Sequence, residues 1–420
     1  MQTPERISSE KLLQRFIRYA KIWTTSDPHG TGSPTTSRQW ELLHLLASEL
    51  EEMGVAVELD DQGFLIGRLS ARGVGPGAST VGFMAHVDTS PDVSGKDVSP
   101  IIHRRWQGTA IELKNSVILD PERMTDLASR KGDTIITSDG TSLLGADDKA
   151  GIAEIMAAIE YLQANPELPH GPLEIIFTPD EETGKGMDRF PRDRIQSRCC
   201  YTLDGDESGT LEAECFTAYR ADISFFGVAA HPGRARGRLV NAISMLGSFL
   251  GMLPRSESPE ATDGRYGFYH GVEVSGHTEK AELTMILRDF EMDEVERRVE
   301  ALRSFASALE AAYPGGKVKV AWVKQYLNMR DAFKKDPLVV DLARKAVSSL
   351  GLNPIMTSIR GGTDGARLSE LGIPTPNLFT GGHNFHSLSE WASLEVMTYA
   401  AETILALALL WGEIESPPPS

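Results

Sequence analysis

The chain has 420 residues, of which 41% are hydrophobic and 24% charged, and its formal net charge at pH 7 is -17. This is the composition of a globular protein with enough residues for two domains, and its acidic balance excludes a general affinity for nucleic acid or anionic membranes. Three cysteines are too few for a disulfide framework, no segment resembles a signal peptide, and no apolar run approaches the ~20 residues that cross a bilayer, so we expect a cytoplasmic protein with no nucleic-acid or membrane partner.

The first half of the chain alternates between helical and strand patterns. Apolar residues at helical spacing predict helices over 8–23, with Ser9 as N-cap, and over 39–53. Alternating segments at 55–59 and 64–69 predict a hairpin. Further apolar runs predict four buried strands and one helix, at 80–85, 134–138, 173–178 and 199–203 and at 152–162. This layout predicts an open, mostly parallel α/β sheet whose functional site lies at the strand ends.

The pattern changes near residue 213. Strand, helix, strand, helix and strand follow one another at 217–228, 240–253, 283–288, 293–313 and 317–324, which predicts an α+β sandwich. After Asn328 the chain returns to helical patterns. We therefore predict an α/β fold, with a mostly parallel mixed-sheet domain formed by residues 1–212 and 327–420 and an inserted α+β sandwich domain at 213–326.

Histidines and carboxylates stand at or just beyond the ends of the apolar segments: His86, Asp88, Asp147, Glu181, Glu182, Asp204 and His386. Taken singly, each has a simpler explanation, because a lone strand-end histidine is usually just hydrogen-bonded and an acidic triplet is usually a solvated turn. Taken together, imidazoles and carboxylates without cysteine suit two zinc-like cations about 3.5–4 Å apart that share one carboxylate. The sequence therefore predicts a dinuclear metal centre.

Two short spacings assign further roles in this centre. Adjacent side chains on extended backbone point in opposite directions, so one of Glu181 and Glu182 can bind a cation while the other acts as a general base. His86 and Asp88 lie two residues apart and share a face, which lets Asp88 accept the second imidazole N–H and fix the tautomer.

Longer motifs indicate a known family. The chain resembles, nearly end to end, the peptidase T family of the co-catalytic dizinc exopeptidases in the segments MAHVDTSPDVSGK (84–96), LLGADDKAGIAEIM (143–156), FTPDEETGKG (177–186), HPGRARG (231–237) and PNLFTGGHNFHSLSE (376–390). The resemblance implies two zinc ions, with cobalt or manganese as alternatives, and short peptides as substrates. It also implies that the insert at 213–326 is a lid or dimerisation domain, in a monomer or a homodimer.

The resemblance further implies a role for each matching residue. His86 and Asp204 would bind one zinc, Glu182 and His386 the other, and Asp147 would bridge them, before a cis peptide to Asp148. Asp88 would support His86, Glu181 would be the general base, and His231 would reach the scissile carbonyl oxygen, in its own chain or across a dimer. Without the resemblance, His231 is typical of a turn before Pro232. Substrate-binding positions would be Arg288, Asn328 and Arg360.

The function expected from the resemblance is removal of the N-terminal residue from tripeptides by a cytoplasmic dizinc aminopeptidase. The alternatives are a dipeptidase or N-acyl amino acid deacylase on the same scaffold, and a catalytically silent, metal-dependent peptide-binding protein. Near His386 the sequence departs from the family, because Ser387, Leu388 and Ser389 follow where a glycine and a basic residue are typical. His383 is a second potential ligand in the same segment.

Overall fold

The computed structural model describes residues 7–414 and divides the chain into two compact units. The large unit comprises Met1–Ala213, Asp331–Thr357 and Thr363–Ser420. The inserted unit comprises Glu214–Arg330 and Ser358–Gly362.

The large unit is built on an eight-stranded sheet with the order β1-β2-β8-β3-β9-β16-β10-β15. The strands are β1 (Ala56–Leu59), β2 (Leu65–Leu69), β3 (Val81–His86), β8 (Leu173–Thr178), β9 (Cys199–Gly205), β10 (Thr210–Cys215), β15 (Ile355–Ile359) and β16 (Asn377–Phe379). The central strands β8, β3, β9 and β16 run parallel, whereas β1, β2 and β10 pair antiparallel with their neighbours. The predicted mixed α/β fold is confirmed.

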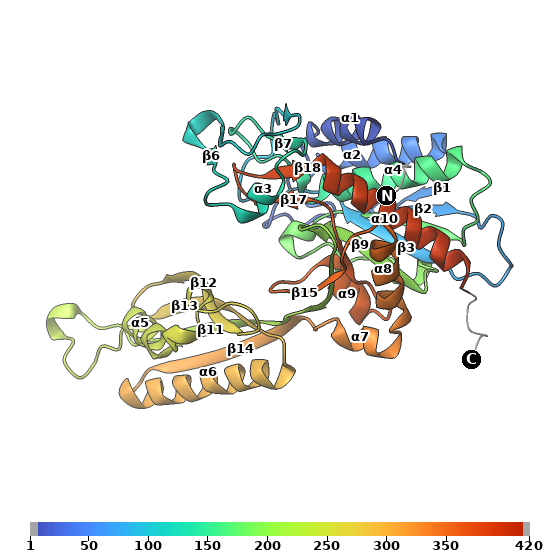
Figure 1. Ribbon diagram of the computed structural model, residues 1–420. Coiled ribbons are helices and arrows are strands. Elements are labelled where there is room, and N and C mark those ends of the chain that lie inside the picture. Colours follow the sequence, from blue (N-terminus) through green and yellow to red (C-terminus); the bar gives the residue numbers. More distant parts are fainter. Residues whose placement is uncertain (1–6, 415–420) are drawn as a thin grey trace. The chain divides into compact units, whose positions relative to one another are not determined.

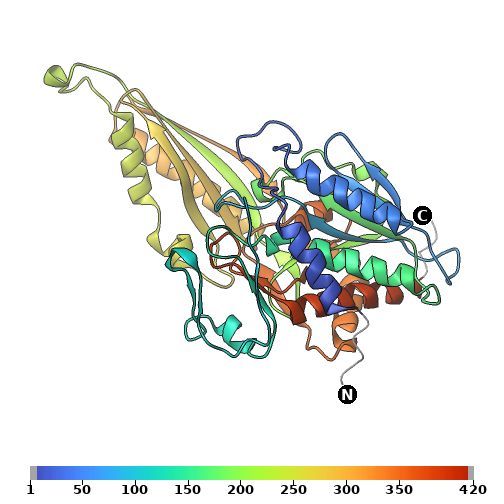
Figure 2. The same ribbon diagram turned by 90° about the horizontal axis from the view of Figure 1, so that it is seen from above.

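Both faces of this sheet are covered, as a parallel sheet requires. Strand register puts Ile66, Ile176 and Met84 on one face, where they pack with Leu368 of α9 (Asp364–Glu370). The other face, which includes Phe83, is covered by helices. These are α2 (Gln39–Glu52), α4 (Ala146–Ala164) and α10 (Leu394–Gly412), with α1 (Ser9–Ala20) beside α4 and α10 (Figures 1 and 2).

Helix α10 corrects one sequence-based expectation. Among the described residues it is the one helix long and apolar enough to cross a membrane by length and composition, so the expectation that no apolar run approaches that length is wrong. Its apolar window is 72% buried inside the protein. Trp411 near its end is fully buried and donates from Nε1 to the hydroxyl of Tyr201, 3.0 Å away. Burial of this kind is the ordinary property of a core helix.

A second, four-stranded sheet in the large unit has the order β17-β18-β7-β4. Its strands are β4 (Ile101–His103), β7 (Ile135–Thr137), β17 (Gly382–His383) and β18 (Trp391–Ser393). Beside it lie β5 (Ile111–Glu112), β6 (Ile118–Leu119) and α3 (Thr125–Ser129), around a core of Trp106, Leu119, Leu127, Ile135 and Trp391. This sheet joins the segment around His386 to the loop that precedes α4.

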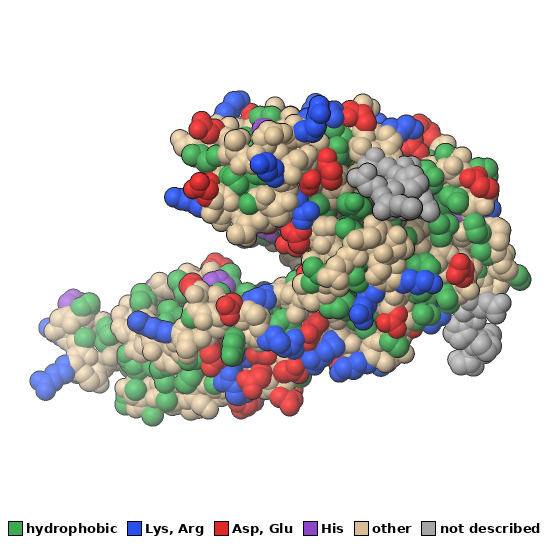
Figure 3. All heavy atoms as spheres, in the orientation of Figure 1, with side chains coloured by type: hydrophobic (Ala, Val, Ile, Leu, Met, Phe, Trp, Pro, Cys, Tyr) green, Lys and Arg blue, Asp and Glu red, His purple; other side chains and the backbone are tan. Residues whose placement is uncertain are grey.

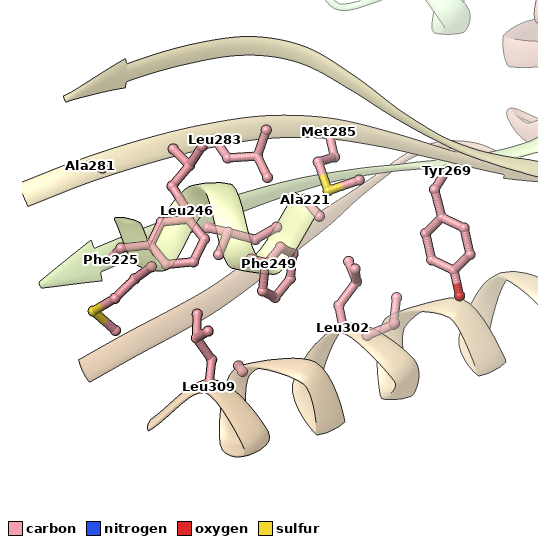
Figure 4. Packing of buried hydrophobic residues seen from close by; sticks show 14 of the residues in the cluster. Ala221, Phe225, Leu246, Phe249, Tyr269, Ala281, Leu283, Met285, Leu302 and Leu309 are labelled. Carbon is pink, nitrogen blue, oxygen red and sulfur yellow. The ribbon is translucent and has the colours of Figure 1, made fainter. Parts of the chain in front are cut away.

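The inserted unit is an antiparallel four-stranded sheet, β12-β13-β11-β14, packed on two helices. Its elements are β11 (Thr217–Phe226), β12 (Phe268–Gly276), β13 (Lys280–Asp289), β14 (Lys317–Tyr326), α5 (Ala242–Met252) and α6 (Met292–Ala312). Phe225, Phe249, Leu283 and Leu302 meet in its core (Figure 4). The edge strand β12 was not predicted: seven of its nine residues are exposed, and its apolar alternation is confined to Val272 and Val274, between Gly271 and Gly276.

Most element boundaries agree with the sequence patterns, including the β1–β2 hairpin and α8 (Leu338–Ser349), which follows α7 (Arg330–Lys335). The N-cap of α1 differs from the prediction. It is Ser8, whose Oγ accepts from the backbone N–H of Lys11, and not Ser9. On the face shown in Figure 3, acidic and basic side chains are interspersed.

Candidate metal centre

Three neighbouring parallel strands bring their carboxyl ends to one edge of the large sheet. His86 is the last residue of β3, Asp204 lies near the end of β9, and Glu181 follows the end of β8 by three residues. Parallel strands β8, β3 and β9 present these ends together. Asp147 lies at the start of α4, and His386 lies in the loop between β17 and β18.

One carboxylate lies between the two imidazoles. Asp147 Oδ1 is 2.9 Å from His86 Nε2, and Asp147 Oδ2 is 3.2 Å from His386 Nε2. Each imidazole also faces a second carboxylate: Asp204 Oδ1 lies 3.7 Å from His86 Nε2, and Glu182 Oε2 lies 2.8 Å from His386 Nε2. Five side chains that are distant in the sequence therefore meet in one cluster.

Asp88 supports this cluster in two ways. Its Oδ1 lies 3.3 Å from His86 Nδ1, as its position two residues after His86 suggested. Its carboxylate also accepts the backbone N–H groups of Glu181 and Glu182, at 3.0 and 3.2 Å. The backbone carbonyl of Asp88, 3.1 Å from His86 Nδ1, helps the carboxylate to orient this ring. The hold of the carboxylate on the backbone of the acidic pair was not foreseen.

The side chains of Glu181 and Glu182 point to different neighbours, but for a reason other than the expected alternation along a strand. They begin a 3-10 turn, Glu181–Thr183, so the alternation of extended backbone does not apply. Glu182 faces His386, whereas Glu181 lines a small cavity together with His86, Asp204 and Asp364. Burial raises the pKa of Glu181 well above its ordinary value, against the opposing charge of His86. A carboxylate of this kind is suited to proton transfer near neutral pH.

The remaining carboxylates repel one another. Burial, with the charge of Asp147 added, raises the pKa of Glu182 to about 8 and that of Asp204 to about 6. Hydrogen bonds to Asp147 and Glu182 raise the pKa of His386 to about 11. Burial would raise the pKa of Asp147, but its hydrogen bonds to the two imidazoles hold it below its ordinary value. The raised carboxylate pKa values reflect burial and mutual repulsion, which a bound cation would relieve.

The donor atoms fit divalent cations. Ligand atoms of His86, Asp147 and Glu182 lie within 4.8 Å of one another, and so do those of His86, Asp148 and Asp204. Glu182 Oε1 and Asp148 Oδ1 are buried and have no hydrogen-bond partner within residues 7–414. Such orphaned oxygens are costly unless a cation satisfies them. Imidazole and carboxylate donors suit zinc, cobalt or manganese.

Asp148 is a residue that sequence reasoning did not assign to the cluster. It is fully buried, and its Oδ2 accepts the backbone N–H of His86 at 3.2 Å. The peptide bond from Asp147 to Asp148 is cis, as the family resemblance implied. The repeated aspartate in the sequence was the available signal for its importance.

His383 does not join the cluster. Its ring is buried and stacks on Trp391 at a centroid distance of 4.2 Å, and its Nδ1 lies 3.4 Å from Asp126 Oδ2. His386 instead faces Asp147 and Glu182, and its Nδ1 lies 3.2 Å from Asp92 Oδ2. The backbone of His386 is left-handed, with φ of 59°. Of the two histidines in this segment, the structure brings only His386 to the cluster.

Asp180, the first acid of the triplet, attaches the triplet to a further segment. It is buried and has left-handed backbone, with φ of 62°. Its carboxylate accepts the backbone N–H of Thr35 at 2.8 Å, the hydroxyl of Thr35 at 2.5 Å and Gln39 Nε2 at 2.7 Å. The first acid of the triplet therefore ties the glycine- and serine-rich loop at 27–37 to the strand exit.

The predicted residues of the inserted unit have local partners. His231 is exposed and caps the short 3-10 helix Pro232–Arg234, with its Nδ1 accepting the backbone N–H of Gly233 at 3.2 Å. Arg288 is hydrogen-bonded to the hydroxyl of Tyr326. The roles predicted for these two residues in catalysis and binding stay predictions.

Two further predicted substrate positions are engaged within the inserted unit. Asn328 Oδ1 accepts the backbone N–H of Arg330 at 3.0 Å, and its Nδ2 donates to the carbonyl of Phe290 at 3.1 Å. Arg360 donates to the carbonyls of Gly264 and Tyr266, both at 2.9 Å. These contacts explain how the side chains are held, and substrate binding by them stays a prediction.

Comparison with known proteins identifies the family. Residues 143–410, more than half of the chain, match the model of Peptidase family M20/M25/M40. A solved structure from Bacillus subtilis, described as a dinuclear metal-binding peptidase of family M20, has the same fold, with a TM-score of 0.66 at 16% identity over 96% of this chain and 98% of that one. The chain therefore belongs to peptidase family M20/M25/M40, and within it to the peptidase T group.

The assignment to this group rests on full-length similarity. The chain is 44% identical to Peptidase T of Clostridium perfringens over 96% of its own length and 100% of that protein. It is 42% identical to Peptidase T of Geobacillus thermodenitrificans over 96% of its length and 98% of that protein. The aminopeptidase PepT from Bacillus cereus shares the fold, with a TM-score of 0.75 at 24% identity over 97% of this chain and 100% of that one. The resemblance seen in the motifs is confirmed.

Proposed function

We propose that the protein is a metal-dependent aminopeptidase that removes the N-terminal residue from tripeptides. The observation that carries this proposal is the Asp147 carboxylate, which lies between two imidazoles that each face a further carboxylate. Similarity to proteins named Peptidase T over 96% of the chain supports the substrate class. We further propose a cytoplasmic location and a monomeric or homodimeric state.

The proposed ligands divide into two sets. His86 and Asp204 would hold one zinc ion, Glu182 and His386 would hold the other, and Asp147 would contribute to both; cobalt and manganese suit the same donors. When bound, the two cations supply the positive charge that activates water and polarises the scissile carbonyl. Asp88 keeps His86 in the tautomer whose Nε2 is free to bind, because it faces Nδ1 of the same ring.

Glu181 is the proposed general base. Its carboxylate takes a proton from the attacking water and gives it to the amine that leaves, so one residue serves both halves of the hydrolysis. The raised pKa that burial produces makes it a stronger base than an exposed glutamate, and Asp364 in the same cavity works in the same direction.

The remaining assignments rest on the family resemblance. His231 is proposed as the donor to the scissile carbonyl oxygen, and residues 213–326 as a lid. Arg288, Asn328 and Arg360 are proposed to bind the polar ends of the peptide. For Arg360 the bidentate guanidinium suits a C-terminal carboxylate, and part of its present hydrogen bonding to Gly264 and Tyr266 would be exchanged for the substrate.

Two alternatives predict different substrates. A dipeptidase or deacylase would cleave Ala-Ala or N-acetyl amino acids and leave Ala-Ala-Ala intact. A silent binding protein would hold metal and peptide without turnover. Glu181 and Asp88 argue against the second alternative, because binding needs the metal ligands but needs no general base.

The test is a substrate comparison with purified protein. Ala-Ala-Ala, Ala-Ala and N-acetylalanine are incubated with protein loaded with zinc, cobalt or manganese, and the released amino acid is quantified. We expect cleavage of the tripeptide at its first bond and little cleavage of the other two. Absence of tripeptide cleavage with all three metals would refute the proposal.

A further inference from the structure

Glu390 holds the entrance of helix α4. The side chain is 1% exposed, and its carboxylate accepts three backbone N–H groups: Leu144 at 2.6 Å, Gly145 at 2.8 Å and Asp147 at 3.2 Å. Helix α4 has no side-chain cap of its own, since its N-cap residue is Gly145. An anionic acceptor at a helix N-terminus satisfies otherwise unpaired donors and complements the helix dipole.

The segment between β17 and β18 contacts Asp147 at two points. Glu390 Oε1 accepts the backbone N–H of Asp147, and His386 Nε2, four residues earlier in the chain, lies 3.2 Å from its carboxylate. Directly after Glu390, Trp391 begins β18, which pairs with β7. The segment is therefore anchored at Trp391. The contact between the Glu390 carboxylate and the backbone of Asp147 then helps to set the distance from His386 to Asp147.

We infer that Glu390 is a positioning residue that fixes the Asp147 carboxylate relative to His386 and thereby sets the affinity for the cation held between them. This inference rests on the proposed function. All three groups that face the carboxylate are backbone donors, and a glutamine at this position would turn an N–H₂ group towards at least one of them. Outer partners of metal ligands typically contribute about 10–100-fold to metal affinity.

The experiment compares Glu390→Gln with Glu174→Gln. Glu174 is a matched control, because it is also 1% exposed and its carboxylate accepts the backbone N–H groups of Gln196 and Ser197 and the hydroxyl of Ser197. It lies near the start of β8, at the end opposite to the cluster. Zinc dissociation constants are measured by competition with a chromogenic chelator, and thermal unfolding is followed on the metal-free proteins.

We expect Glu390→Gln to weaken the binding of one zinc equivalent by about 10–100-fold, and Glu174→Gln to leave both equivalents within about twofold of wild type. At saturating zinc, kcat for Ala-Ala-Ala falls in Glu390→Gln while KM changes little. Wild-type zinc affinity in Glu390→Gln, with only its thermal stability reduced, would overturn the inference and leave a purely structural cap.

Glu390→Asp keeps the inference testable if the glutamine variant fails to fold. It retains the charge but withdraws the carboxylate by one methylene, so we expect weakened binding of one zinc equivalent and a preserved fold. Wild-type affinity in this variant would overturn the inference. If wild type binds two zinc ions and cleaves tripeptides while the Glu390 variants bind zinc as the control does, only the positioning role is refuted. A wild-type protein that binds no zinc refutes the proposed function as well.

Discussion

Neighbouring acids in this protein differ in what surrounds them more than in their chemistry. The Asp180 carboxylate accepts hydrogen bonds from Thr35 and Gln39, whereas Glu181 lines a cavity and Glu182 faces His386. Burial raises the pKa of all three, but only Glu181 combines a raised pKa with a position beside the proposed ligands and outside the ligand set. That combination is what a general base requires.

Replacing Glu181 by glutamine tests whether this residue acts as the general base and not as a metal ligand. We expect kcat for Ala-Ala-Ala to fall by about 10²–10⁴-fold, the usual contribution of a general base, while zinc content is retained. Glu182→Gln is the control, and it should lose zinc because Glu182 faces His386. Zinc is measured by atomic absorption and turnover by the release of alanine; full turnover in Glu181→Gln would exclude it as the base.

Burial of Glu154, which is not part of the candidate site, predicts that the stability of the protein depends on pH. Both of its carboxylate oxygens are buried without a hydrogen-bond partner in the described part of the chain, and burial raises its pKa well above the ordinary value. The folded state therefore holds the proton more tightly than the unfolded state. The free energy of unfolding falls as pH rises from the unfolded pKa, near ~4.3, towards the raised folded pKa.

Glu154→Gln removes this titration. We expect wild type to lose stability relative to the variant as pH is raised from 5 to 8, because groups common to both proteins cancel in the difference. Urea unfolding of the two proteins at several pH values measures it. A difference in unfolding free energy that does not change with pH would contradict the assignment.

At the level of elements, the exits of β3, β8 and β9 carry the site, and loops from elsewhere hold those exits in place. The loop at 27–37 is attached to the β8 exit through Asp180, and Lys185 Nζ donates to the carbonyls of Pro28 and Gly30 at 2.7 and 2.8 Å. Loop 27–37 is thus part of the framework that orients Glu181.

Asp180→Ala tests this attachment. The substitution leaves the N–H of Thr35 and the amide of Gln39 without their acceptor, and we expect a loss of about 1–3 kcal/mol in unfolding free energy together with reduced kcat. Asp61→Ala is the control, because Asp61 is exposed in the β1–β2 turn. Urea unfolding measures both variants, and equal stabilities would show that the loop is not held through Asp180.

At the scale of the whole molecule, the proposed metal ions join segments that are far apart in the chain. The five proposed ligands come from β3, the start of α4, the turn after β8, β9 and the loop after β17. The unfolded chain does not hold these residues together, so metal binding favours the folded state.

Metal removal should therefore lower stability. A ligand present at 100 times its dissociation constant stabilises the folded state by about 2.7 kcal/mol. We expect a chelator to lower Tm and zinc to restore it, whereas calcium should not, because imidazole donors suit zinc better. Differential scanning calorimetry measures the change, and an unchanged Tm after verified metal removal would argue against a site that links these segments.

The sequence by itself determined the class of fold and the chemistry of the site. Apolar periodicity depends on local spacing, so it predicted β3, β8, β9 and α4. Residue type alone marked His86, Asp147 and one of the pair Glu181 and Glu182 as candidate metal donors. Apolar periodicity missed the edge strand β12, which is mostly exposed and whose alternation is confined to Val272 and Val274.

Only the tertiary structure decided between His383 and His386, because stacking on Trp391 removes one of them from the cluster. It also decided that Glu390 caps α4 and that Asp88 holds the backbone after β8. The contacts of Glu390 and Asp88 join residues that are 245 and 93 positions apart in the chain. No local pattern encodes them, since they exist only when the sheet and its loops have packed.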